Sequence, residues 1–328
     1  MSPKELIPVL TKCMRAGLPV LIKGAPGIGK SDIVSQVAKK LKMNLIISHP
    51  VVSDPTDFKG LPGIVDGEAE FLPFGELRKL INAKKPTIAF LDDLGQAPAV
   101  VQAAAMQLIL ARRVNGHKIS DKVVFVAATN RRQDRAGVTG VLEPVKSRFA
   151  TIIELNADAN EWIEWAFDNE MPSELIGFIN FRPALLCTEE ATAEIVNHPC
   201  PRTIAFCGKL IKAGLNSIEV LAGAIGNGAA AELVGFLKVY KNLPSIDAIL
   251  LDPNHGEIPT DPATIYAIVA ALVEKATEDS AERILKYANR LPADFSVLLV
   301  RDMIRKDAKI QNTTGFIQWA TKHQDVLL

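Results

Sequence analysis

The sequence predicts an α/β domain built on a five-stranded parallel sheet, followed by a purely helical region. Two observations predict the sheet: short runs of β-branched and aliphatic residues recur in the first half, and helical stretches separate them. Strands that alternate with helices in this way form a parallel sheet covered by helices on both faces. The third observation is that strand signals end after about residue 156, which predicts the helical region.

The elements can be assigned in order along the chain. Strands are expected at residues 19–23, 44–48, 87–91, 123–128 and 151–155, and helices between them at 30–42 and 98–113. Asn115-Gly116 is a hairpin-turn signal just before the fourth strand. Later helices are expected at residues 161–168, 173–180, 201–214, 229–240, 264–275, 280–290 and 293–307, with a loop region at 243–263. The predicted division is an α/β domain at 1–156, a helical domain at 157–240 and a helical C-terminal extension at 241–328.

Composition limits the function classes. Lys plus Arg and Asp plus Glu are equal in the 328 residues, 37 against 37, which argues against a strongly basic nucleic-acid binder. The first residues lack the apolar core of a signal peptide, and runs such as 265–273 are too short to span a bilayer. A soluble, cytoplasmic protein is expected. The four cysteines have no CxxC spacing and are expected to be reduced, mostly buried thiols.

The stretch GAPGIGKS at residues 24–31 fits the phosphate-loop pattern G-x-x-x-x-G-K-[ST], between an expected strand and an expected helix. Its glycines let backbone N–H groups point at phosphate oxygens, and the helix start adds a positive dipole end. Lys30 would reach the β- and γ-phosphates, and Ser31 would supply a hydroxyl to Mg²⁺. The residues expected to contact the nucleotide are Gly24, Ala25, Pro26, Gly27, Ile28, Gly29, Lys30, Ser31 and Asp32.

Polar residues follow two further strands. Asp92 and Asp93 come directly after strand 87–91, and Asn130 comes after strand 123–128. Parallel strands deliver ligands at their carboxyl ends, so Asp92 is predicted to bind the metal and Asp93 to activate water. The alternative is that the two acids cap a helix. Asn130 could hydrogen-bond the attacking water or the γ-phosphate, although Asn is also common at strand ends.

Two arginines are candidates for phosphate contacts. Arg148 precedes the fifth strand, and a guanidinium from a neighbouring subunit would stabilise the charge on a transferring phosphoryl group. Considered by itself, a surface ion pair is the better explanation of Arg148. Arg202 stands at the start of a helix, where a cation is unfavourable for the macrodipole, and this misplacement points modestly to a ligand.

In this order, GAPGIGKS, FLDDLGQA, AATN, EPVKSRF and PRT resemble AAA+ ATPases, and more narrowly their MoxR-like branch. The resemblance covers residues 1 to about 215. It implies an αβα ATP-binding domain, a helical lid, and a ring, commonly hexameric, with ATP and Mg²⁺ at the subunit interfaces. The roles it implies are the phosphate loop for Lys30 and Ser31, the metal and water acids for Asp92 and Asp93, sensor 1 for Asn130, the arginine finger for Arg148 and sensor 2 for Arg202, with Arg131, Arg132 and Arg135 as rivals for the interface role.

The resemblance also suggests a use for the ring. MoxR-like rings often remodel or activate other proteins, frequently with a partner that carries a von Willebrand factor A domain. The sequence departs from the branch at Asp93, where the second acid is usually Glu. Asp is one methylene shorter, and small misplacements of a catalytic group slow a reaction, so a slow but real ATPase is expected.

Two alternatives share the nucleotide motifs. A DNA-directed motor or loader would need a basic stripe along its pore and would bind with a steep salt dependence. The neutral composition disfavours it. A nucleotide-gated assembly scaffold would bind ATP and form the ring, with hydrolysis attenuated by Asp93.

Overall fold

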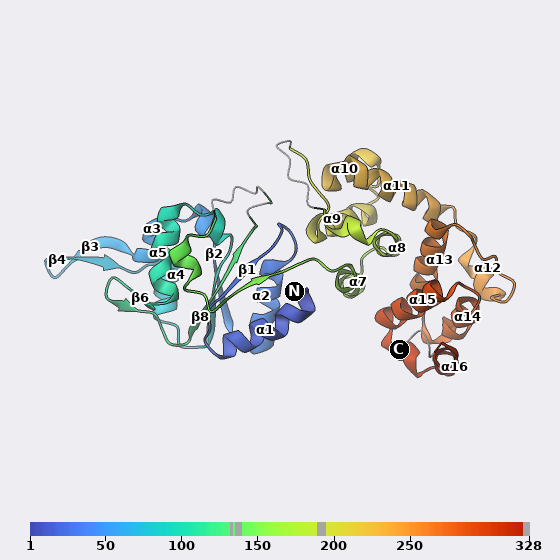
Figure 1. Cartoon of the computed structure of the whole chain (residues 1–328), viewed down its shortest axis with the longest axis horizontal. Helices are drawn as coiled ribbons and strands as arrows, with labels where there is room; N and C mark the ends of the chain where they lie inside the picture. The colour runs from blue at the N-terminus through green and yellow to red at the C-terminus, as the bar shows by residue number, and fades with distance from the viewer. Residues whose placement is uncertain (132–133, 135–139, 189–194, 324–328) are drawn as a thin grey trace. The chain divides into compact units, whose positions relative to one another are not determined.

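The computed structural model describes residues 1–131, 134, 140–188 and 195–323, and it divides into two compact units (Figure 1). The first unit contains Met1–Asp158. The second contains Ala159–Thr188 and the described residues after 194. The end of the first unit lies close to residue 156, where the strand signals of the sequence end.

The first unit is built on a five-stranded sheet in the order β2-β5-β8-β1-β9. All neighbouring strands are parallel, for example with Ile22 opposite Ala128 and Phe90 opposite Val126. The strands are β1 (Val20–Lys23), β2 (Asn44–Ser48), β5 (Thr87–Leu91), β8 (Val123–Thr129) and β9 (Thr151–Glu154). The α/β fold class and its five parallel strands are thus confirmed.

Helices cover both faces of this sheet. They are α1 (Pro3–Arg15), α2 (Lys30–Leu41), α3 (Pro55–Lys59), α4 (Gly75–Ile81), α5 (Ala99–Ile109) and α6 (Glu143–Lys146). One face of β5 and β8, with Leu91 and Phe125, packs against apolar side chains of α3, α4 and α5. Figure 1 shows α1 and α2 beyond the other face, whose residues, such as Phe90 and Val126, are also buried. Burial on both sides explains the continuous apolar runs of these strands.

Two hairpins project from the first unit. The Asn115-Gly116 turn joins β6 (Arg113–Val114) to β7 (His117–Lys118) with positive φ at both turn residues, so this prediction is confirmed. The second hairpin, β3 (Leu61–Val65) and β4 (Glu68–Leu72), was not predicted. Every β4 residue is exposed, so the strand lacks the buried alternation by which a half-buried strand is recognised.

The expected helix at 98–113 is too long. α5 ends at Ile109, because the chain reverses into the β6–β7 hairpin and Arg112 takes a positive φ of 51°. Between β5 and α5 lies a single 3₁₀ turn, η2 (Leu94–Gln96). Another short 3₁₀ turn, η1 (Pro50–Val52), follows β2.

The second unit is helical in all the elements that the structure describes. They are α7 (Ala159–Asp168), α8 (Ser173–Phe181), η4 (Pro183–Leu186), α9 (Pro201–Lys212), α10 (Ile218–Ile225), α11 (Asn227–Lys241), α12 (Ile246–Leu251), α13 (Pro262–Glu274), α14 (Glu278–Ala288), α15 (Ala293–Lys306), η5 (Ala308–Asn312) and α16 (Thr314–Lys322). The sequence did not predict α10, α12 or α16, and α12 lies inside the expected loop at 243–263.

The helices before and after residue 240 pack together. α8 and α13 approach so closely that a Cβ on Gly177 would lie 2.7 Å from the Ala270 methyl group. α13, α14, α15 and α16 share an apolar core that includes Tyr287 and Trp319. Residue 240 is therefore not a boundary of packing, and a lid at 157–240 that acts separately from an extension at 241–328 stays a prediction about function.

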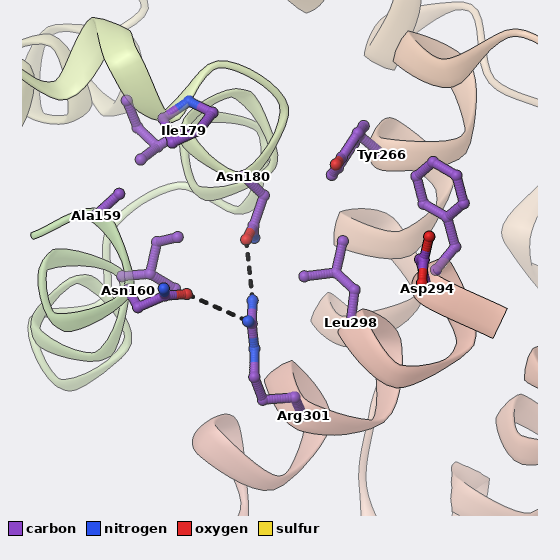
Figure 2. Close-up of a pocket in the computed structure, with 11 residues that line it drawn as sticks. Ala159, Asn160, Ile179, Asn180, Tyr266, Asp294, Leu298 and Arg301 are labelled. Carbon is purple, nitrogen blue, oxygen red and sulfur yellow. Dashed lines mark hydrogen bonds between the residues drawn. The ribbon is translucent and has the colours of Figure 1, made fainter. Parts of the chain in front are cut away.

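In the second unit, a cluster of hydrogen-bonded polar side chains lies beside a cavity of about 350 Å³ (Figure 2). Asp302 is buried, and its carboxylate accepts from Arg301 and Arg305 at 3.1 Å each and from Asn180 at 2.8 Å. The Arg301 guanidinium donates to the side-chain oxygens of Asn160 and Asn180, each at 3.2 Å (Figure 2).

Among the described helices of the chain, none combines the length and apolar character needed to cross a membrane.

Candidate functional site

Three segments that carry predicted site residues lie at one edge of the sheet. β8 lies between β5 and β1, and all three strands run parallel. Their carboxyl ends therefore meet at the same edge, where the phosphate loop, Asp92 and Asn130 follow β1, β5 and β8. Hydrogen bonds between side chains join these segments, Lys30 to Asn130 and Ser31 to Asp92.

The phosphate loop depends on glycine at defined positions. Gly27 and Gly29 have φ of 72° and 94°, in the left-handed region that side chains disfavour. A Cβ on Gly24 would lie 2.7 Å from the carbonyl oxygen of Leu155, just after β9, so glycine is needed there for close approach. The loop ends at Gly29, which precedes the first residue of α2, and the N–H groups of that helix start face outward from its N-terminus.

Lys30 is the buried cation of the site. Its side chain begins α2, and only 7% of the residue is exposed. The ammonium donates to the carbonyl oxygens of Gly24 and Ala25, each at 2.9 Å, and to Asn130 Oδ1 at 2.7 Å. A phosphate oxygen that binds Lys30 would compete with these acceptors for the protons of the ammonium group.

Ser31 and Asp92 form an oxygen pair suited to Mg²⁺. Ser31 Oγ donates to Asp92 Oδ2 at 2.6 Å, and Asp92 also receives the backbone N–H of Asp93 at Oδ1. Mg²⁺ takes hard oxygen ligands, usually one or two carboxylates together with waters and substrate phosphates. The hydroxyl and carboxylate fit that requirement. Among the described residues, no group of three or more His, Cys, Asp or Glu side chains is arranged to hold a metal ion.

Asp93 lies in an unusual local conformation. Its φ is 55°, which is uncommon for a residue other than glycine, although Asp tolerates it better than most. It caps the 3₁₀ turn η2, and its Oδ1 accepts from Gln96 Nε2 at 2.7 Å. Sequence analysis did not single out Gln96. The only signal was a polar residue three positions after an acid, within an otherwise apolar stretch.

The arginines predicted to act at a subunit interface make their described contacts elsewhere. Among the described residues, the Arg148 guanidinium contacts Pro144 O at 2.6 Å and Ser147 Oγ at 3.5 Å, both in its own segment. Arg131 pairs with Asp134 at 2.9 Å and approaches Glu154 at 3.8 Å. Arg132 and Arg135, the other two rivals of Arg148 for the interface role, lie outside the described residues.

The remaining predicted residues fall into two groups. In the first unit, Ile28 is buried while Pro26 and Asp32 are exposed, at the mouth of the loop and in the first turn of α2. Arg202 is exposed in the first turn of α9, in the second unit. Its approach to the nucleotide therefore remains a prediction.

At the end of β9 in the first unit, the hydrogen bond from Lys23 lowers the pKa of Glu154.

Residues 19–149 match the family model described as the AAA domain of the dynein-related subfamily. The matched segment contains the phosphate loop, Asp92, Asp93, Asn130 and Arg148. The match supports an AAA+ ATPase domain. The broader part of the resemblance, to AAA+ ATPases, is therefore supported, and the matched residues lie within the first unit.

Solved structures also show similarity to the chain. The RuvB Holliday junction branch migration motor of Thermotoga maritima is 18% identical, covers 82% of this chain over 80% of its own, and superposes with a TM-score of 0.41. NtrX from Brucella abortus is 11% identical, covers 98% of this chain over 67% of its own, and gives a TM-score of 0.41. No curated protein matches the chain.

Proposed function

We propose that the chain is a MoxR-like AAA+ ATPase that binds ATP with Mg²⁺ at the carboxyl edge of its sheet and hydrolyses it slowly. The observation that carries the proposal is the pair of hydrogen bonds that joins the three motifs. Lys30 reaches Asn130, and Ser31 reaches Asp92, across segments that are 100 and 61 residues apart in the sequence. The phosphate-loop lysine thus contacts the polar strand end, and the next residue contacts the metal acid, which brings together groups that nucleotide hydrolysis uses.

Each binding residue has a distinct role in the proposal. Lys30 donates to the β- and γ-phosphate oxygens, exchanging one of its present acceptors for them. Ser31 and Asp92 hold Mg²⁺, which neutralises phosphate charge when it is bound. The phosphate-loop N–H groups and the start of α2 supply further donors to the phosphates.

Hydrolysis then needs a positioned water. Asp93 accepts the proton as the water oxygen bonds to the γ-phosphorus, while the bond from phosphorus to the ADP oxygen breaks and the electron pair leaves with ADP. Asn130 orients the water or the γ-phosphate. Arg148, supplied by a neighbouring copy, stabilises the charge on the transferring group.

The ring and its client belong to the same proposal. ATP at an interface joins two copies through Arg148, Arg202 links the helical lid to the nucleotide, and hydrolysis releases both contacts. The ring, hexameric by the resemblance, would use this cycle to remodel or activate a protein client, such as one with a von Willebrand factor A domain.

Binding and assembly can be tested together. A fluorescent ATP analogue is titrated with and without Mg²⁺, and sedimentation velocity is run with and without ATP. Wild-type protein is expected to bind the analogue and to assemble. Asp92→Asn should lose the Mg²⁺ dependence of binding, whereas the control Asp121→Asn, at an exposed ion pair with Lys118, should not. A chain that stays monomeric and binds no analogue would contradict the proposal.

A second candidate function is the nucleotide-gated scaffold, and Asp rather than the usual Glu at position 93 favours it. An acid that is one methylene shorter holds its carboxylate farther from the γ-phosphate and is therefore a poorer base for the attacking water. In that case Asp93→Glu should raise phosphate release greatly while analogue binding stays unchanged. An unchanged or lower rate in Asp93→Glu would rule against the scaffold.

A further inference from the structure

Gln96 connects the Asp93 carboxylate to the end of β8. Its Nε2 donates to Asp93 Oδ1 at 2.7 Å, and its Oε1 lies 3.4 Å from the Thr129 hydroxyl, which also reaches the carbonyl oxygen of Asn130 at 3.1 Å. Thr129 is buried and directly precedes Asn130, whose Oδ1 receives the Lys30 ammonium. One amide side chain therefore stands between the proposed water acid and the strand that carries the proposed sensor.

The position of Gln96 is fixed by its backbone. Gly95 packs against β8 so closely that a Cβ there would overlap the Thr129 hydroxyl. The carbonyl oxygen of Gly95 also accepts the N–H of Gly140 at 3.2 Å, and Gln96 N–H bonds back to Asp93 O at 3.0 Å. The left-handed φ of Asp93 starts this tight turn. Glycine at position 95 is thus the feature that lets η2 approach β8.

We propose that Gln96 is a positioning residue, whose amide holds the Asp93 carboxylate in the orientation needed to receive a proton from the attacking water. The inference rests on the proposed ATPase function. Because Asp is one methylene shorter than Glu, its carboxylate has fewer positions from which it can reach the water, so a contact that fixes its orientation has a larger effect on the reaction. Gln96 makes such a contact with that carboxylate.

The first test separates orientation from binding. Gln96→Met keeps the length of the side chain and removes both polar atoms of its amide. It should lower kcat for ATP by about 10- to 100-fold, since misplacing a catalytic group by about 1 Å has a cost of that size. KM and analogue affinity should change by less than about 2-fold, because Gln96 acts on the chemical step only. The control Gln107→Met, at an exposed position on α5, should match wild type.

A double-mutant cycle tests whether the effect passes through Asp93. In an Asp93→Ala background, Gln96→Met should have no further effect on kcat, because the group that it orients is gone. The same four proteins are compared by melting temperature without nucleotide. The two substitutions should be non-additive by about 2 °C or more, as expected for a lost hydrogen bond to a carboxylate.

The outcomes separate the two proposals. A wild-type kcat in Gln96→Met, or additive effects in both cycles, would overturn the role of Gln96 while leaving the ATPase proposal intact. A wild-type protein that binds ATP but releases no phosphate would contradict hydrolysis. The thermal cycle would still decide whether Gln96 holds Asp93, since it needs no turnover.

Discussion

The chain buries a charged side chain in each of its two units, and the two are held in different ways. Lys30 in the first unit is 7% exposed and Asp302 in the second is 2% exposed. Lys30 donates to two backbone carbonyls and one amide. Asp302 accepts from two guanidinium groups and one amide, and one of these cations, Arg305, is itself paired with Glu164 at 3.2 Å.

The different partners of Lys30 and Asp302 indicate that Lys30 serves ligand binding and Asp302 serves stability. The loop and amide around Lys30 are partly exposed, and carbonyl acceptors are readily exchanged for phosphate oxygens. Asp302 is matched by opposite charges that the helices themselves supply, so the cluster needs no ligand. We therefore expect changes at the edge of the sheet to alter function with only a small loss of stability, and changes at Asp302 to alter stability at constant function.

The largest expected effect is at Arg148. Arg148→Ala should lower phosphate release by about 10³-fold or more, because a finger supplied in trans is worth that much, while analogue binding and thermal stability stay near wild type. The reason for unchanged stability is that its guanidinium contacts only its own segment among the described residues. The control Arg113→Ala, exposed on β6, should be neutral. Unchanged phosphate release in Arg148→Ala would show that Arg148 is not the arginine finger.

The opposite pattern is expected at Asp302. Asp302→Ala leaves Arg301 and Arg305 without their shared carboxylate and should lower the free energy of unfolding of the second unit by about 3–5 kcal/mol. Denaturant unfolding followed by hydrogen exchange measures this loss and assigns it to the helices. The control is Asp247→Ala, at an exposed ion pair with Lys275, which should cost less than about 1 kcal/mol. Loss of ATP-analogue binding in folded Asp302→Ala would contradict the separation of roles.

A smaller effect is expected in alkaline solution, and it falls on the second unit. Burial raises the pKa of the Cys207 thiol from 9.0 to about 12 and that of the Tyr287 phenol from 10.0 to about 12, with Arg290 opposing the Tyr287 shift. The Tyr240 pKa is raised as well, by burial and by its hydrogen bond to Glu274.

These groups are held neutral in the folded state, so their stabilisation is complete below the unfolded pKa values and is lost as pH rises toward the folded ones. Between pH 8 and pH 10 the second unit should lose about 1–2 kcal/mol of stability. Chemical denaturation at the two pH values measures the loss. Cys207→Ala should reduce it, and a loss of the same size in that variant would show that another group is responsible.

Much of the first unit could be predicted because its strands are buried on both faces. The runs at β5 and β8 are continuously apolar, and the polar residues that end them stand out. The β3–β4 hairpin could not be predicted in this way, since most of its residues are exposed and none is buried. The end of α5 was also missed, because the turn at Arg112 depends on the hairpin that follows rather than on helix propensity.

In the candidate site, the residues at strand ends could be predicted from the sequence, whereas Gln96 could not. Lys30, Ser31, Asp92 and Asn130 could be placed at one edge because parallel strands bring their carboxyl ends together. The role of Gln96 could not be predicted, since it depends on how closely Gly95 packs against Thr129, which no local pattern records. Sequence spacing locates groups at strand ends, whereas contacts across the sheet edge require the folded structure.

Phosphate release from ATP tests the central claim most directly, measured in parallel for wild type, Lys30→Met and the surface control Lys118→Met, at matched protein concentration with Mg²⁺. The account predicts slow release by wild type and by Lys118→Met that scales with protein concentration and stops when Mg²⁺ is chelated. It predicts no release above background by Lys30→Met, which should still melt near the wild-type temperature without nucleotide. Equal phosphate release by wild type and Lys30→Met would contradict an ATPase site at this edge of the sheet.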